Sequence, residues 1–195
     1  MNKLRTAARQ VEFIGSFPED PPVLGLPEVA FVGRSNVGKS SALNKLLGAK
    51  AARTSRTPGR TQLVNLFRLG EVAVFADLPG YGFAKVSKAD RDRWKSMIDR
   101  YLAMRTDLRA CVVLVDGRLP PQGLDVTMIE ALGTYEIPTI VVATKVDKLS
   151  RGERAKALAT IEDGFELPKG ALVPFSSVSG EGVDDLWRSL SDVLG

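Results

Sequence analysis

The sequence contains no histidine and a single cysteine, Cys111, among its 195 residues. The missing imidazole excludes hydrolases that need a histidine base, and it excludes metal centres ligated by histidine. One thiol cannot form an internal disulfide or a cysteine zinc cluster. Cys111 lies in the apolar run A-C-V-V-L-V, so we expect it to be a buried core residue.

Long hydrophobic runs are also missing. The basic residues 1–10 are not followed by an apolar signal segment, and no run approaches the roughly 18 residues that a membrane span requires. We therefore expect a cytoplasmic protein without a membrane span. We also expect a monomer. Lys and Arg total 27 against 23 Asp and Glu, and the resulting charge of +4 is compatible with a polyanionic partner.

Short apolar runs alternate with helical patterns along the chain, which is typical of a sheet built from βα units. Only Gly70 and Glu71 separate the second and third predicted strands, so we expect an antiparallel hairpin beside otherwise parallel strands. The predicted strands are 28–32, 63–69, 72–76, 110–115, 139–143 and 172–175. The pattern predicts an α/β domain over 28–195, with a mostly parallel sheet of about six strands and one antiparallel edge strand, after an N-terminal extension, 1–27.

Three helices are indicated by apolar stripes or by capping signals. A stripe from Trp94 to Leu102 follows a start at Ser87 and Asp90 that resembles a capping box. Ser150 with Glu153 forms a second capping box. The last helix begins near Val183 and carries Trp187 on its apolar face, so we expect Trp187 and Trp94 to lie in the core.

A phosphate-binding motif follows the first predicted strand. Residues 33–40 read G-R-S-N-V-G-K-S, which matches G-x-x-x-x-G-K-[ST] between a strand and a helix running to about residue 47. In such a P-loop the backbone N–H groups point at phosphate oxygens, Lys39 reaches the β- and γ-phosphates, and Ser40 holds Mg²⁺. The expected nucleotide contacts are Gly33, Arg34, Ser35, Asn36, Val37, Gly38, Lys39 and Ser40.

A D-x-x-G motif follows the third predicted strand. Asp77 stands at the carboxyl end of that strand, where a carboxylate can hold Mg²⁺ through water, and the Gly80 N–H can meet the γ-phosphate. A lone D-x-x-G is a weak signal, but its place one strand away from the P-loop gives it weight. The predicted contacts are Asp77, Leu78, Pro79 and Gly80.

Two later motifs indicate which base is bound. Asp147 can accept from guanine N1–H and N2–H₂, a donor pair that adenine lacks, while the Lys145 stem lies along the base. Backbone N–H groups after the last strand would donate to guanine O6. These motifs comprise Thr144, Lys145, Val146 and Asp147, followed by Ser176, Ser177 and Val178.

The motifs G-R-S-N-V-G-K-S-S, T-P-G-R-T-Q, D-L-P-G-Y-G, T-K-V-D-K and F-S-S together resemble the EngB (YihA/YsxC) family of bacterial translation-factor-type GTPases. Thr144 stands where most GTPases have Asn, and this departure agrees with the narrower family. The resemblance implies a three-layer P-loop GTPase fold with GTP or GDP and Mg²⁺ as ligands. It also implies a role in large ribosomal subunit assembly, with its rRNA or proteins as partners, and in cell division and septation.

The resemblance also assigns residues in the first switch loop. Thr54, Thr57 and Thr61 are all candidates for the Mg²⁺-binding threonine. Similarity to T-P-G-R-T-Q selects Thr61. The further nucleotide contacts that it implies are Ser41, Gly59, Arg60, Gln62 and Leu63.

Two residues bear on the rate of hydrolysis. Tyr81 follows Gly80, where many GTPases have the glutamine that orients the attacking water, so we expect slow intrinsic hydrolysis by a site of Lys39, Asn36, Thr61 and Gly80. Asn36 is similar to an asparagine that helps hold K⁺ in related GTPases, where the ion replaces an arginine finger. A plain turn residue is the other interpretation of Asn36.

Arg53, Arg56 and Arg60 make the first switch loop basic. They suit rRNA phosphate contact, although a solvated loop would have the same composition. Two alternative functions also stay open. One is a P-loop small-molecule kinase, which would bind adenine and have no use for T-K-V-D. The other is a nucleotide-gated RNA or membrane-surface adaptor in which hydrolysis is incidental.

Overall fold

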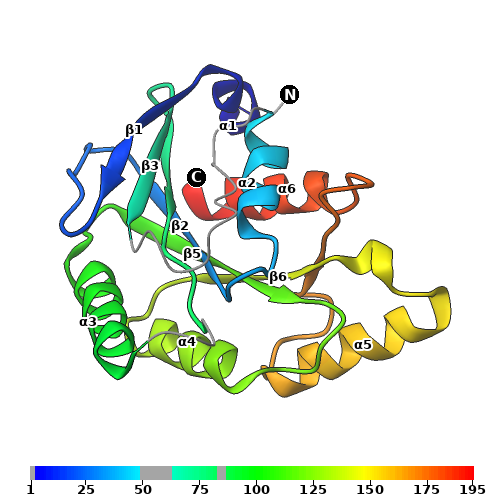
Figure 1. Ribbon diagram of the computed structural model, residues 1–195. Helices are drawn as coiled ribbons and strands as arrows, with labels where there is room; N and C mark the ends of the chain where they lie inside the picture. The colour runs from blue at the N-terminus through cyan, green and yellow to red at the C-terminus, as the bar shows by residue number, and fades with distance from the viewer. Residues whose placement is uncertain (1–2, 49–62, 83–86) are drawn as a thin grey trace.

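The computed structural model describes residues 3–48, 63–82 and 87–195. Its centre is a seven-stranded sheet with the order β1-β3-β4-β2-β5-β6-β7 (Figure 1). β3 is antiparallel to both of its neighbours, and the other strand pairs are parallel. The strands are β1 (Val11–Phe17), β2 (Glu28–Gly33), β3 (Val64–Leu69), β4 (Ala73–Asp77), β5 (Leu108–Asp116), β6 (Thr139–Thr144) and β7 (Val173–Pro174).

Helices cover both faces of the sheet and give the three layers that were predicted (Figure 1). One core lies between the sheet and α1, α2 and α6, and the other lies between the sheet and α3, α4 and α5. None of the helices within the described ranges is long and apolar enough to cross a bilayer. The helices are α1 (Lys3–Ala7), α2 (Lys39–Leu47), α3 (Lys88–Met104), α4 (Gly123–Thr134), α5 (Arg151–Gly164) and α6 (Val183–Leu194).

The predicted fold class is confirmed, and all six predicted strands are present with ends shifted by at most two residues. The predicted capping box at the start of α5 forms between Ser150 and Glu153. Cys111 and Trp187 are buried in the core as expected. Trp94 is only half-buried, and its indole donates to the Pro79 carbonyl in the loop after β4.

The sheet has one strand that the sequence analysis missed. β1 pairs with β3, so β3 is the second strand of the sheet and not its edge. The register of the pair shifts between Phe13 and Gly15, and this bulge breaks the alternation that marks a half-buried strand. Leu4 and Ala8, which precede β1, are buried in the same core as α2 and α6. Residues 3–17 therefore pack as part of the same folded unit.

Candidate functional site

The P-loop joins β2 to α2, which is the strand and helix context that its motif requires. Gly33 is the last residue of β2, and α2 begins at Lys39. A Cβ atom at Gly33 would lie 2.7 Å from the carbonyl oxygen of Leu114, so only glycine fits beside β5. Gly38 has a φ of 106°, and this conformation turns the chain into the helix at little steric cost. The loop backbone is thus held close to the sheet with the helix N-terminus behind it.

Lys39 and Asp77 form an ion pair at the carboxyl ends of the neighbouring strands β2 and β4. Their side chains are only 12% and 8% exposed. The second carboxylate oxygen of Asp77 accepts from Asn65 Nδ2 at 3.3 Å. The P-loop lysine and the D-x-x-G aspartate, predicted from separate motifs, therefore lie in contact.

The D-x-x-G loop runs along the P-loop as a continuation of the β2–β4 pairing. Ser35 N–H donates to the Tyr81 carbonyl at 2.8 Å, and Tyr81 N–H donates to the Gly33 carbonyl at 3.3 Å. Gly80 lies between these contacts, and a Cβ atom there would be 3.2 Å from the Gly33 oxygen. This geometry keeps the backbone of Gly80 beside the phosphate-binding loop.

The Tyr81 side chain is buried in the core beside α3 and α4. Its hydroxyl donates to Asp125 Oδ1 at 2.6 Å, and its ring meets Trp94 edge-on with centroids 5.5 Å apart. Burial, followed by the nearby Asp125, raises the pKa of Tyr81 well above its ordinary value, so the hydroxyl keeps its proton and acts as a donor. In this conformation the hydroxyl hydrogen of Tyr81 is engaged by Asp125 and is not free to orient a water molecule.

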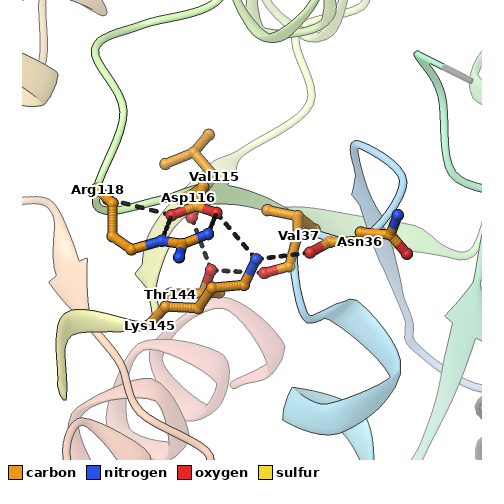
Figure 2. Close-up of polar contacts among 7 residues, drawn as sticks. All are labelled: Asn36, Val37, Val115, Asp116, Arg118, Thr144 and Lys145. Carbon is orange, nitrogen blue, oxygen red and sulfur yellow. Dashed lines mark hydrogen bonds and ion pairs between the residues drawn. The ribbon is translucent and has the colours of Figure 1, made fainter. Parts of the chain in front are cut away.

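Thr144 and Lys145, which follow β6, tie the guanine motif to the P-loop (Figure 2). The Thr144 hydroxyl lies 2.7 Å from the Val37 carbonyl oxygen and 2.9 Å from that of Val115. Lys145 has a φ of 60°, and its ammonium donates to the Asn36 carbonyl at 2.6 Å. Threonine thus bridges the two loops here, at the position where most GTPases carry asparagine.

Asp116 belongs to the same cluster, although the sequence analysis did not single it out. It ends β5 and accepts from Lys145 Nζ at 2.9 Å, while Arg118 binds both of its oxygens (Figure 2). Partial burial raises the pKa of Asp116, but the hydrogen bonds from Arg118 and Lys145 outweigh it and hold that pKa well below the usual range. Asp116 therefore stays charged and fixes the Lys145 stem. The signal was available, because Asp116 follows a predicted strand as Asp77 does.

Asp147 lies beside the loop after β7, as the guanine motifs require. Its Oδ1 accepts from Ser176 Oγ at 2.7 Å, and this hydrogen bond lowers the pKa of the Asp147 carboxyl. Ser176 is fully buried, and its hydroxyl also accepts from the Val178 and Ser179 N–H groups. The carboxylate is 18% exposed, so it can still receive a ligand while its orientation is fixed.

The other predicted contacts divide into two groups. Leu63 directly precedes β3, and Ser41 is exposed on the first turn of α2. The switch-loop residues Thr54, Thr57, Arg53 and Arg56 lie outside the described residues, as do the predicted contacts Gly59, Arg60, Thr61 and Gln62.

Comparison with known proteins identifies the family. The family described as 50S ribosome-binding GTPase matches residues 28–145. An EngB GTP-binding protein from an Exiguobacterium species is 47% identical over 93% of this chain and 94% of its own length. Its counterpart from Pelobacter propionicus is 49% identical over 93% of this chain and 92% of its own length. The chain belongs to the EngB family of GTP-binding proteins.

Solved structures agree with this assignment. A crystal structure of an EngB-type GTP-binding protein aligns with a TM-score of 0.74 at 26% identity and covers 86% of this chain and 98% of its own length. Aquifex aeolicus Era bound to GDP and AlF₄⁻ aligns with a TM-score of 0.68 at 26% identity, over 86% of this chain and 56% of its own. The EngB chain is thus a P-loop GTPase, and the small-molecule kinase alternative is set aside.

Proposed function

We propose that this EngB chain is a GTP-driven switch that acts in assembly of the large ribosomal subunit in the cytoplasm and supports normal cell division. The observation that carries the nucleotide part is the convergence of four motifs at one edge of the sheet. They follow β2, β4, β6 and β7, and contacts between Lys39 and Asp77 and between Thr144 and Val37 join them. Open α/β sheets bind ligands at this edge.

The phosphates would be held by P-loop N–H groups and Lys39, with the Gly80 N–H facing the γ-phosphate. Ser40 and Asp77, with Thr61, would hold Mg²⁺. The donor set fits this ion, because Mg²⁺ prefers oxygen ligands and the Asp77 carboxylate lies at the P-loop beside Lys39. When bound, Mg²⁺ neutralises charge that develops on the transferred phosphoryl group.

Base selection is assigned to Asp147. A carboxylate that keeps its charge, with Ser176 fixing its orientation, suits the two donors on the guanine edge. The Lys145 stem would lie along the base, since its ammonium is anchored on Asn36 and Asp116. K⁺ beside Asn36 is proposed as the charge that serves in place of a glutamine or an arginine finger.

The ribosomal part of the proposal rests on relatives. The family description names 50S ribosome binding, and an Era structure that aligns with a TM-score of 0.67 at 25% identity contains nucleotides 1506–1542 of 16S ribosomal RNA. The net charge of +4 and the arginines of the first switch loop suit an RNA partner. We propose that GTP orders this loop for contact with rRNA.

Calorimetric titration tests the nucleotide part directly. We expect GDP to bind and ADP not to bind, because adenine lacks the donor pair that Asp147 accepts. Asp147→Asn should weaken GDP binding by about 2–4 kcal/mol and favour xanthosine diphosphate, whose C2 carbonyl matches an amide donor. Asp163→Asn removes an exposed carboxylate on α5 and serves as the matched control. Unchanged GDP and XDP affinities in Asp147→Asn would refute the assignment.

A further inference from the structure

Three contacts surround Gly80 and fix the loop on which it lies. Before Gly80, the Pro79 carbonyl accepts a hydrogen bond from the Trp94 indole of α3 at 3.0 Å. After Gly80, the Tyr81 backbone is hydrogen-bonded to Gly33 and Ser35 of the P-loop. The third contact is the hydrogen bond from the Tyr81 hydroxyl to Asp125.

The third contact is the one that reaches across layers. Asp125 lies in the first turn of α4 and is 2% exposed, and Tyr81 is 4% exposed. A hydroxyl and a carboxylate that are both buried orient each other strongly, because neither can turn to water instead. The Tyr81 ring is therefore held between α3 and α4, and its backbone stays paired with the P-loop.

We propose that Tyr81 and Asp125 are positioning residues for GTP hydrolysis, because their hydrogen bond holds the D-x-x-G loop on the P-loop with Gly80 facing the γ-phosphate. The inference rests on the assignment of Gly80 to the γ-phosphate made above. Tyr81, which stands where many GTPases have a catalytic glutamine, would then serve to position Gly80. The residue acts through the backbone of its neighbour and does not touch the reacting atoms.

The proposal separates two nucleotides that share most of their contacts. GDP has no γ-phosphate, so its binding does not depend on where Gly80 lies. GTP binding and hydrolysis do depend on it, and a shift of about 1 Å at a reacting centre can cost as much as a hundredfold in rate. If the Tyr81–Asp125 contact positions Gly80, breaking it should weaken GTP binding and slow hydrolysis but leave GDP affinity unchanged.

The test measures kcat, the affinity for GDP and the affinity for a GTP analogue with an imido bridge between its β- and γ-phosphates. In Tyr81→Phe we expect kcat and analogue affinity to fall about tenfold or more, with GDP affinity within about twofold of wild type. Asp125→Leu removes the acceptor and should behave like Tyr81→Phe. Asp125→Asn keeps an acceptor oxygen, so it should retain most of the wild-type rate that Asp125→Leu loses. The double variant Tyr81→Phe with Asp125→Leu should lose no more than either single variant.

Tyr101→Phe is the matched control. Tyr101 is also buried and also donates to a buried carboxylate, that of Glu28, but Glu28 begins β2 whereas the P-loop follows its end. Tyr101→Phe should lower the melting temperature without changing kcat. The proposal is overturned if Tyr81→Phe behaves like this control, or if it weakens GDP and the analogue equally. If wild type binds neither nucleotide, the P-loop assignment itself fails and this inference fails with it.

Discussion

The Thr144 hydroxyl, at the end of β6, donates to the Val37 carbonyl in the middle of the P-loop, 107 residues earlier in the chain. Its oxygen also lies 2.9 Å from the carbonyl oxygen of Val115 at the end of β5. One side chain thus joins the loop that would hold the phosphates to the motif that would select the base. Thr144 is 3% exposed, so water cannot take the place of its hydroxyl.

Thr144→Val tests the structural importance of this contact. Valine has the same shape but no donor, so the Val37 carbonyl loses its buried partner. We expect the free energy of unfolding to fall by about 1–3 kcal/mol and GDP affinity to fall as well. Urea unfolding and calorimetry measure the two effects. Thr144→Ser should retain both properties.

A control at the other end of the same strand isolates the effect on nucleotide binding. Thr139 begins β6 and donates to the Ile137 carbonyl at 3.0 Å, away from the P-loop. Thr139→Val should leave GDP affinity unchanged. Equal losses of GDP affinity in Thr139→Val and Thr144→Val would contradict a specific link to the P-loop.

Lys39→Met should affect stability as well as binding. Without the ammonium, the Asp77 carboxylate stays buried, and among the described residues its remaining side-chain partner is Asn65 at 3.3 Å. We therefore expect a loss of about 3 kcal/mol in the free energy of unfolding. The double variant Lys39→Met with Asp77→Asn should recover much of this stability but not GTP binding. Urea unfolding with nucleotide titration checks both expectations. Wild-type GTP affinity in Lys39→Met would show that the P-loop assignment is wrong.

Ser40→Ala tests the metal site without breaking the ion pair, because that pair is formed by the side chains of Lys39 and Asp77. We expect Mg²⁺-dependent hydrolysis to be lost while the free energy of unfolding changes by no more than about 0.5 kcal/mol. Steady-state rates across a Mg²⁺ titration measure the first effect. A wild-type Mg²⁺ dependence in this variant would remove Ser40 from the metal site.

The role of Asn36 can be separated from its backbone conformation. Its φ of 64° favours Asn, Asp or Gly whatever the side chain does, and its amide points away from Lys145 (Figure 2). If the amide oxygen holds K⁺, hydrolysis should be faster in K⁺ than in Na⁺ or Li⁺, and Asn36→Gly should abolish this difference. Asn36→Asp keeps both an oxygen and the backbone conformation, so it should retain the preference. Equal rates in the three salts at matched ionic strength would count against K⁺ assistance.

The sequence predicted those parts of the site that depend on local pattern. Lys39, Asp77 and Asp147 each follow a strand that its apolar run identified, and such ends meet at one edge of a parallel sheet. The bulge in β1, the contact of Asp116 with Lys145 and the contact of Asp125 with Tyr81 were missed. They depend on contacts between distant segments, which no spacing along the chain encodes.

The most direct test of the switch proposal is co-sedimentation of the full chain with large ribosomal subunits in different nucleotide states. We expect binding with Mg²⁺ and a non-hydrolysable GTP analogue, and release with GDP. The logarithm of the affinity should fall with that of salt concentration, with a slope of roughly −0.7 to −0.9 per phosphate contact. Replacing Arg53, Arg56 and Arg60 by alanine should flatten that slope, and phosphate release in a single turnover should quicken when subunits are present. Phosphate release that subunits do not quicken would favour a nucleotide-gated adaptor in which hydrolysis is incidental. Association that ignores the nucleotide, or that keeps its full salt dependence in the triple variant, would contradict the switch proposal.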